Sequence, residues 1–179
     1  MRKIVVLSGS PRRNGNSEKL ADAFIRGAES AGHQVKKMSV IDYPVKGCLG
    51  CDYCMRNNGE CIQKDGMQAI FEELYQADMV VFATPVYYWN MTSQLKAVVD
   101  RLYASIAKPL PITSSALLAS LGGNVQEDGK LTVDNYNIIT NYMKLKDEGV
   151  IIADKVMNKN EIDGNPILEE AEMLGRSLK

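Results

Sequence analysis

Short apolar runs alternate with amphipathic segments along the whole chain. The runs have the length of β-strands and lie at Ile4–Leu7, Val35–Val40, Met79–Ala83, Ala116–Leu121 and Val150–Ala153. The segments between them carry apolar residues at spacings of three and four, the period of a helix with one buried face. Nearly continuous apolar strands that alternate with helices are typical of a parallel sheet covered on both faces. The pattern therefore predicts a doubly wound α/β domain with five parallel strands.

Several helices can be placed from their apolar stripes and their end signals. The first follows a polar loop, and we expect Ser17 to be its N-cap. The helical spacing also predicts helices near residues 91–102 and 132–146. Asn165 as N-cap and Pro166 at the first helical position signal the last helix.

Composition narrows the class of protein. The 179 residues are predicted to form one domain, 1–179, large enough to bury a core. The net charge is −1 and the basic residues are scattered, so we expect no nucleic-acid binding. The apolar runs are far shorter than a membrane span and no signal-peptide pattern is present, so we expect a cytoplasmic protein without membrane contact. The one histidine, His33, precedes a strand and is expected at the surface.

The loop after the first strand reads Gly9-Ser-Pro-Arg-Arg-Asn-Gly-Asn-Ser17 and predicts a phosphate site. It places uncharged donors and arginine at the start of a helix, whose free amides favour an anion. It lacks both the lysine of a Walker A loop and a G-x-G-x-x-G pattern. A tightly held FMN monophosphate therefore fits better than a triphosphate. A serine N-cap after a surface turn would account for Ser17 alone.

The third strand runs into a second loop, Pro85-Val-Tyr-Tyr-Trp-Asn90. In doubly wound sheets, ligands bind at the carboxyl ends of the strands where the strand order reverses, and flavodoxin holds FMN beside its first and third strands. A flat isoalloxazine needs an aromatic wall and backbone amides near its polar edge, and this loop supplies both. The rings could instead only cover the edge of the sheet, but the phosphate loop on a neighbouring strand favours the flavin.

These two segments, Gly-Ser-Pro-Arg-x-x-Gly-Asn-Ser and Thr-Pro-Val-Tyr-Tyr-Trp-Asn-Met-Thr-Ser-Gln-Leu-Lys-x-x-x-Asp-Arg, resemble the NADPH-dependent FMN reductase family of flavodoxin-like proteins. The resemblance extends over nearly the whole chain and implies a flavodoxin-like sheet of strand order 2-1-3-4-5, FMN as cofactor and NAD(P)H as electron donor. It places the FMN phosphate on Ser10, Arg12, Asn16 and Ser17. It places the flavin ring on Pro85, Val86, Tyr87, Tyr88 and Asn90, with a further contact at Gly122 and Gly123. Those two glycines also fit an ordinary turn after a strand.

Four cysteines lie within fourteen residues of a segment, about 41–66, that has no helix or strand pattern: Cys48, Cys51, Cys54 and Cys61. The first three have the spacing of a bacterial ferredoxin run, but six residues precede the fourth and no proline follows it. The resemblance narrows here to the iron-sulfur flavoproteins, which implies a [4Fe-4S] cluster on these cysteines. Zinc and metal-free thiols remain open as alternatives.

The expected function is that of an FMN-dependent oxidoreductase or electron-transfer flavoprotein with a small-molecule donor or acceptor. One alternative is an NAD(P)H-dependent FMN or quinone reductase without a cluster. Another is a non-enzymatic FMN-binding electron carrier or redox sensor. We predict no catalytic acid or base, because the cofactor carries the chemistry. The resemblance also implies a homodimer or homotetramer. A ferredoxin-like protein is an alternative to a small molecule as the electron-transfer partner.

Overall fold

Five parallel strands form one sheet in the order β2-β1-β3-β4-β5, which confirms the order implied by the family resemblance. The computed structural model describes all residues from 1 to 179. The strands are β1 (Lys3–Ser8), β2 (Gln34–Ser39), β3 (Met79–Pro85), β4 (Ser114–Ser120) and β5 (Lys146–Ala153).

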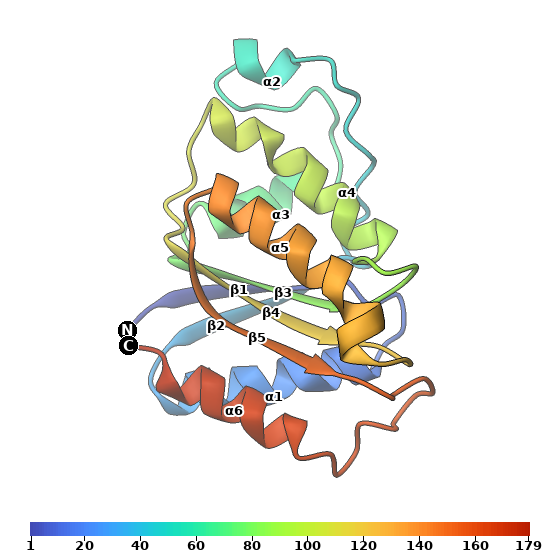
Figure 1. Cartoon of the computed structure of the whole chain (residues 1–179). Helices are drawn as coiled ribbons and strands as arrows, with labels where there is room; N and C mark the ends of the chain where they lie inside the picture. The colour runs from blue at the N-terminus through green and yellow to red at the C-terminus, as the bar shows by residue number, and fades with distance from the viewer.

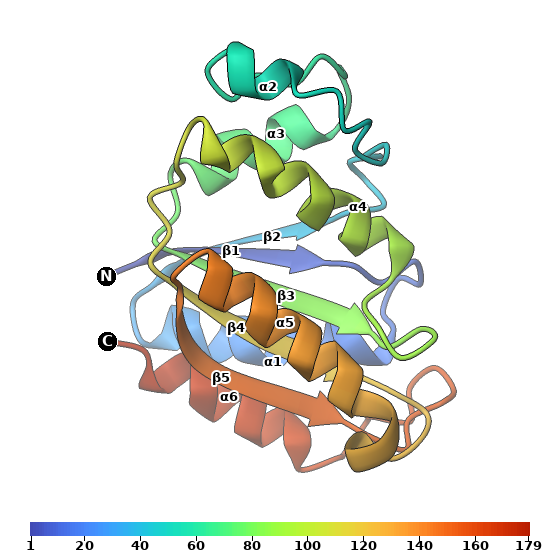
Figure 2. The same cartoon turned by 45° about the horizontal axis from the view of Figure 1, so that its top comes forward.

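Helices cover both faces of the sheet. The helices α1 (Asn16–Ser30) and α6 (Ile167–Ser177) lie side by side on one face, as Figures 1 and 2 show. The opposite face carries α3 (Met67–Leu74), α4 (Ser93–Arg101) and α5 (Lys130–Tyr142). Three short elements complete the chain: α2 (Tyr53–Arg56), the 3₁₀ helix η1 (Leu102–Ile106) and the π-helical turn η2 (Val125–Gly129).

The two faces have separate apolar cores because successive strand residues point in opposite directions. In β1, Val5 and Leu7 belong to the core under α3, α4 and α5. Ile4 and Val6 belong to the core under α1 and α6. All four are buried. This is why the strand reads as an unbroken apolar run rather than an alternating one.

The helices α1 and α6 approach so closely that their contact leaves no room for side chains at two positions. A Cβ on Gly27 would lie 1.9 Å from the carbonyl oxygen of Glu172, and one on Gly175 would lie 2.2 Å from that of Phe24. The backbones therefore pack directly against each other, and this contact holds α1, including its first turn, in place on the sheet.

Several expectations from the sequence about helix ends and burial are wrong. The last helix begins at Ile167 with Pro166, not Asn165, as its N-cap, although the Asn165 Oδ1 accepts a hydrogen bond from the Ile167 amide at 3.0 Å. The helix expected at 132–146 ends at Tyr142, because Lys144 takes a left-handed φ of 57° and the amide of Leu145 donates to the carbonyl of Thr140 at 2.9 Å. His33 is buried, not at the surface. Its Nδ1 accepts a hydrogen bond from the amide of Arg2 (3.1 Å), and its Nε2 lies 3.2 Å from the carbonyl oxygen of Leu178.

The strand order reverses between β1 and β3, so the loops that follow these strands diverge and leave space between them. The loops after β4 and β5 end at the same edge of the sheet. None of the helices combines the length and the apolar character that crossing a membrane requires.

Candidate functional site: a cavity at the carboxyl edge of the sheet

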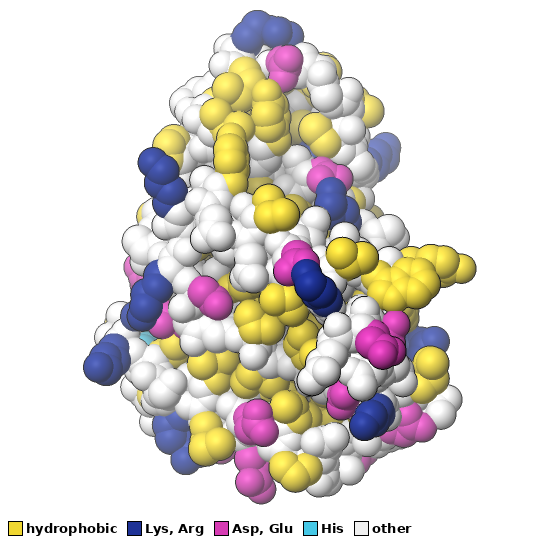
Figure 3. Space-filling view, viewed as in Figure 1, with side chains coloured by type: hydrophobic (Ala, Val, Ile, Leu, Met, Phe, Trp, Pro, Cys, Tyr) yellow, Lys and Arg dark blue, Asp and Glu magenta, His cyan; other side chains and the backbone are white.

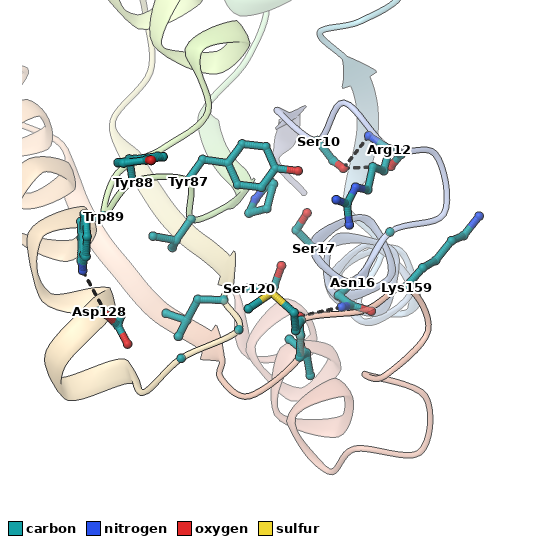
Figure 4. Close-up of a pocket in the computed structure, with 18 residues that line it drawn as sticks. Ser10, Arg12, Asn16, Ser17, Tyr87, Tyr88, Trp89, Ser120, Asp128 and Lys159 are labelled. Carbon is teal, nitrogen blue, oxygen red and sulfur yellow. Dashed lines mark hydrogen bonds between the residues drawn. The ribbon is translucent and has the colours of Figure 1, made fainter.

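A cavity of about 530 Å³ opens at the carboxyl ends of β1, β3 and β4 (Figure 4). This volume lies within the range of roughly 300–1,000 Å³ that is usual for small-molecule sites. All the cofactor residues predicted from the sequence except Asn90 line it: Ser10, Arg12, Asn16, Ser17, Pro85, Val86, Tyr87, Tyr88, Gly122 and Gly123. The fold therefore brings the two loops and the glycine pair to one place.

The start of α1 forms one end of the cavity. The helix begins at Asn16 with Gly15 as its N-cap, two residues before the predicted cap Ser17. Ser17 lies inside the first turn and lines the cavity. The amides of Asn16, Ser17 and Glu18 have no acceptor within the protein. Free amides at the positive end of a helix form a ready anion site.

The loop before α1 is held by its own polar groups. The hydroxyl of Ser10 donates to the carbonyl of Arg12 at 2.8 Å and accepts from the Arg12 amide at 3.1 Å. The Glu18 carboxylate accepts from the amide of Asn14 and pairs with Lys37 at 3.4 Å, and it does not line the cavity. Arg12 forms no ion pair, and Figure 4 shows its side chain turned toward Ser17.

The side chain of Asn16, expected to bind a phosphate, instead donates to backbone carbonyl groups. Its Nδ2 donates to the carbonyl oxygens of Val156 (3.0 Å) and Asn158 (2.8 Å). Its Oδ1 is buried and has no hydrogen-bond partner. The side chain therefore joins α1 to the segment after β5 and leaves one acceptor without a partner.

The aromatic end of the cavity is a tight turn in a strained conformation. Tyr87 and Asn90 exchange two backbone hydrogen bonds of 2.8 and 3.2 Å, and the central residues Tyr88 and Trp89 have φ values of 46° and 62°. Left-handed backbone at such residues costs on the order of 1–3 kcal/mol each and persists only where neighbours enforce it. Here Trp89 donates from Nε1 to Asp128 (3.0 Å) and accepts at its carbonyl from Thr132 (3.0 Å).

Asn90 shapes this turn rather than lining the cavity. Its Oδ1 accepts a hydrogen bond from the amide of Met91 at 2.8 Å, next to the backbone pair with Tyr87. Tyr88, in the same turn, does line the cavity. Its side chain is 93% exposed and projects at the mouth of the cavity (Figure 4).

The glycines after β4 leave backbone open to the cavity. The amides of Gly122 and Gly123 have no acceptor in the protein. A Cβ on Gly123 would lie 2.0 Å from a carboxylate oxygen of Asp128, so a side chain there would displace that carboxylate. An unobstructed row of amides at this place can donate to carbonyl groups of a flat ligand.

Sequence reasoning missed several lining residues: Trp89, Ser120, Leu121, Asp128, Val156, Met157 and Lys159. Trp89 belonged to the predicted aromatic run, so a signal for it existed. Asp128 and the segment after β5 carry no motif, and only the fold brings them to the cavity.

The cysteine segment lies apart from this cavity, at the far side of α4 (Figures 1 and 2). Cys48 and Cys51 are exposed, and Cys54 and Cys61 are partly buried. Burial raises the pKa of the Cys54 thiol, and the nearby Cys61 and Cys48 act in the same direction. No three of these side chains are grouped so as to hold a metal ion. The donor set has the chemistry of a cluster site, but the sulfurs as placed do not converge on one point.

Apolar side chains surround the cysteine segment. Figure 3 shows them on the upper part of the molecule, over α2 and the end of α4. The exposed ones in this region include Tyr53, Met55, Tyr103 and Ile106.

The strand order, the anion site after β1 and the aromatic turn after β3 together define a flavodoxin-like domain with a site suited to a flavin mononucleotide. Residues 2–140 match the family described as NADPH-dependent FMN reductase, so the chain belongs to that family.

Two relatives are iron-sulfur flavoproteins of archaea. The one from Methanosarcina thermophila is 30% identical over 169 residues, which cover 94% of this chain and 85% of the relative. One from Archaeoglobus fulgidus is 38% identical over 100 residues, or 56% of this chain and 45% of the relative. The chain spans about half the length of several curated relatives that it matches.

Solved structures confirm the fold. An NAD(P)H:quinone oxidoreductase from Methanothermobacter marburgensis superposes with a TM-score of 0.76 at 18% identity, covering 99% of this chain and 96% of that one. An azoreductase from Bacillus anthracis gives a TM-score of 0.74 at 17% identity, covering 99% and 100%.

Proposed function

We propose that this chain is an FMN-dependent oxidoreductase that takes electrons from NAD(P)H and passes them to a small acceptor. The observation that carries the proposal is that the two ends of one cavity differ in chemistry. One end has free helix amides and Arg12, and the other has a strained aromatic turn. This arrangement matches a molecule with a phosphate at one end and a flat ring at the other. Bound FMN would supply the hydride and single-electron chemistry.

The protein's own groups bind and orient the cofactor in this proposal. The amides of Ser17 and Glu18 and the Ser17 hydroxyl donate to the phosphate, whose charge Arg12 complements. The turn at Tyr87 and Tyr88 forms one wall for the ring, and the amides of Gly122 and Gly123 donate to its polar edge. Because the turn is fixed by Asp128 and Thr132, little conformational freedom is lost on binding.

The test is a titration of the apoprotein with FMN and with riboflavin. We expect about one FMN per chain and weaker binding of riboflavin, which lacks the phosphate. Ser17→Ala should lower FMN affinity by about fivefold to tenfold, the equivalent of one hydrogen bond to a charged group, while Ser93→Ala, at the exposed start of α4, should not. A wild-type chain that does not distinguish the two flavins would contradict the phosphate assignment. Anaerobic oxidation of NADH or NADPH by the loaded protein then separates an enzyme from a non-enzymatic electron carrier or redox sensor.

We also propose that the four cysteines hold a [4Fe-4S] cluster. The compact thiol spacing and the names of the archaeal relatives support this. Because the sulfurs do not converge in the structure, binding would draw the segment together. Anaerobic reconstitution should give about four irons and four sulfides per chain. Cys51→Ser should lose them and keep FMN, since the cavity lies elsewhere, and zinc in the native protein would contradict the assignment.

A reductase without a cluster is the second candidate. The exposure and separation of the cysteines favour it, and the quinone oxidoreductase and azoreductases of similar fold are compatible with it. Iron and sulfide analysis distinguishes the two candidates.

The proposal also includes a homodimer or homotetramer, a ferredoxin-like partner and a cytoplasmic location. Light scattering of the purified protein tests the oligomeric state.

A further inference from the structure

The segment between β5 and α6 belongs to the phosphate end of the cavity, although it lies far from the first loop in the sequence. Met157 and Lys159 line the cavity together with Ser10 and Arg12. The first turn of α1 holds this segment through two side chains. Asn16 donates to two of its carbonyl groups, and the ammonium of Lys19 contacts Asp163 at 2.5 Å.

The side chain of Asn16 cannot donate to a phosphate in this arrangement, although its backbone amide remains free. An asparagine amide has two N–H groups, and here Nδ2 is engaged with two backbone carbonyl oxygens. The remaining atom, Oδ1, is an acceptor in a side chain that is 8% exposed, and it has no partner. An acceptor has no hydrogen to offer a phosphate oxygen, so neither polar atom of this side chain can bind the phosphate.

Lys159 and Arg12 are the two basic residues that line the cavity, and neither forms an ion pair within the protein. The other basic groups nearby are engaged, since Arg13 pairs with Asp42 and Lys19 pairs with Asp163. Figure 4 shows Arg12 beside the start of α1 and Lys159 at the same end of the cavity with its ammonium turned outward, whereas Asp128 lies at the opposite, aromatic end. Both basic residues of the cavity thus belong to the end at which the free helix amides lie.

We propose that Lys159 supplies a second positive charge to the phosphate of FMN, and that the side chain of Asn16 holds the Lys159 segment in place and does not bind the phosphate. This inference rests on the proposed function, since it concerns the same cavity. The lysine stem is flexible, so its ammonium can reach an anion bound at the first turn of α1. The site thereby selects a phosphorylated flavin over an unphosphorylated one.

The test compares Lys159→Met with Lys155→Met, because Lys155 lies in the same segment, is exposed and does not line the cavity. Lys159→Met should weaken FMN binding by about fivefold, as expected for a charge-assisted contact near the surface, and should leave riboflavin affinity unchanged. It should also reduce the dependence of FMN affinity on salt. Lys159→Arg should restore most of the affinity, and Lys155→Met should change neither flavin by more than about twofold.

A double-mutant cycle tests the positioning role of Asn16. If Asn16 acts through Lys159, the Lys159→Met change should have little effect in an Asn16→Ala background, whereas two independent phosphate ligands would give additive losses and overturn this role. Lys19→Met removes the other contact between α1 and this segment, the ion pair with Asp163, and should also diminish the effect of Lys159→Met. This second variant tests the same role if Asn16→Ala folds poorly.

The possible failures are distinguishable. Equal losses of FMN and riboflavin in Lys159→Met, or no loss of either, would overturn the Lys159 assignment while leaving FMN binding by the wild-type chain intact. A wild-type chain that binds neither flavin would overturn the proposed function itself.

Discussion

Arg101 of α4 and Asp65 form a buried ion pair that closes the base of the cysteine segment. The guanidinium donates to both carboxylate oxygens, at 2.9 and 3.3 Å, and also to the carbonyl of Lys46 at 3.0 Å. Asp65 accepts further hydrogen bonds from the amides of Lys46 (3.0 Å) and Met67 (3.1 Å). Both ends of the segment that carries the cysteines are thus fixed to one helix without any contribution from the cysteines.

Replacing one partner of this pair should destabilise the protein strongly. Asp65→Asn leaves the buried guanidinium without its counter-charge, and we expect a loss of about 3 kcal/mol in the free energy of unfolding. Asp100→Asn is the matched control on the same helix, because its pair with Lys96 is exposed and should contribute less than about 0.5 kcal/mol. Urea unfolding of the metal-free protein measures both; equal effects would contradict the structural role given to Asp65.

The same carboxylate should make stability depend on pH in the acid range. Burial alone would raise the pKa of Asp65, but the hydrogen bonds from Arg101 and the two amides outweigh it and hold the pKa below its ordinary value. A carboxylate with a lowered pKa stabilises the fold above its unfolded value of about 3.9, and this contribution is lost as pH falls through the folded value. The stability difference between wild type and Asp65→Asn should therefore be constant near neutral pH and shrink below about pH 4. A difference that does not change over this range would contradict the pKa direction.

The aromatic turn should become more stable when its strain is removed. Tyr88→Gly gives the left-handed position to the residue that tolerates it, while the exposed ring loses little packing. We expect the apoprotein to gain about 1 kcal/mol. Tyr142→Gly, at an exposed tyrosine in the last turn of α5, should instead lose about 1 kcal/mol. Thermal melts of the two variants give opposite shifts if the turn is strained as described.

The close contact between α1 and α6 should be sensitive to a single methyl group. Gly175→Ala places a Cβ against the backbone of Phe24 and Ala28, where no side-chain movement can relieve it, and we expect a loss of several kcal/mol, at least about 2. Gly47→Ala meets no atom within 4 Å and should change stability by less than about 0.5 kcal/mol. Tolerance of Gly175→Ala would show that the helices can separate.

The fold could be predicted from sequence because its signals are local. The five apolar runs mark the strands to within a few residues, and the phosphate loop and aromatic loop identify the carboxyl ends of β1 and β3. The errors occur where the decisive contact is made at a distance. His33 is buried because it bonds to Arg2 and Leu178. The helix α5 ends at Tyr142 because Lys144, a residue that carries no turn signal, takes a left-handed backbone conformation.

The same distinction applies to the site. Ser10, Ser17 and Tyr87 follow motifs and reach the cavity as expected. The side chain of Asn16 also follows a motif, but its bonding partners come from the segment after β5, which no pattern connects to the first loop. Only the folded structure shows that the Oδ1 of Asn16 has no hydrogen-bond partner and that Lys159 lines the same cavity.

Trp89 has a consequence for experiment, because it is the sole tryptophan of the chain and lies in the wall of the cavity. The tryptophan emission of the protein therefore comes from the candidate site alone. Its indole N–H is bound to Asp128, so a change in that contact should shift the wavelength of emission. A flavin in the cavity should quench the Trp89 emission by energy transfer. The decrease in emission then measures occupancy of the site in the unmodified protein.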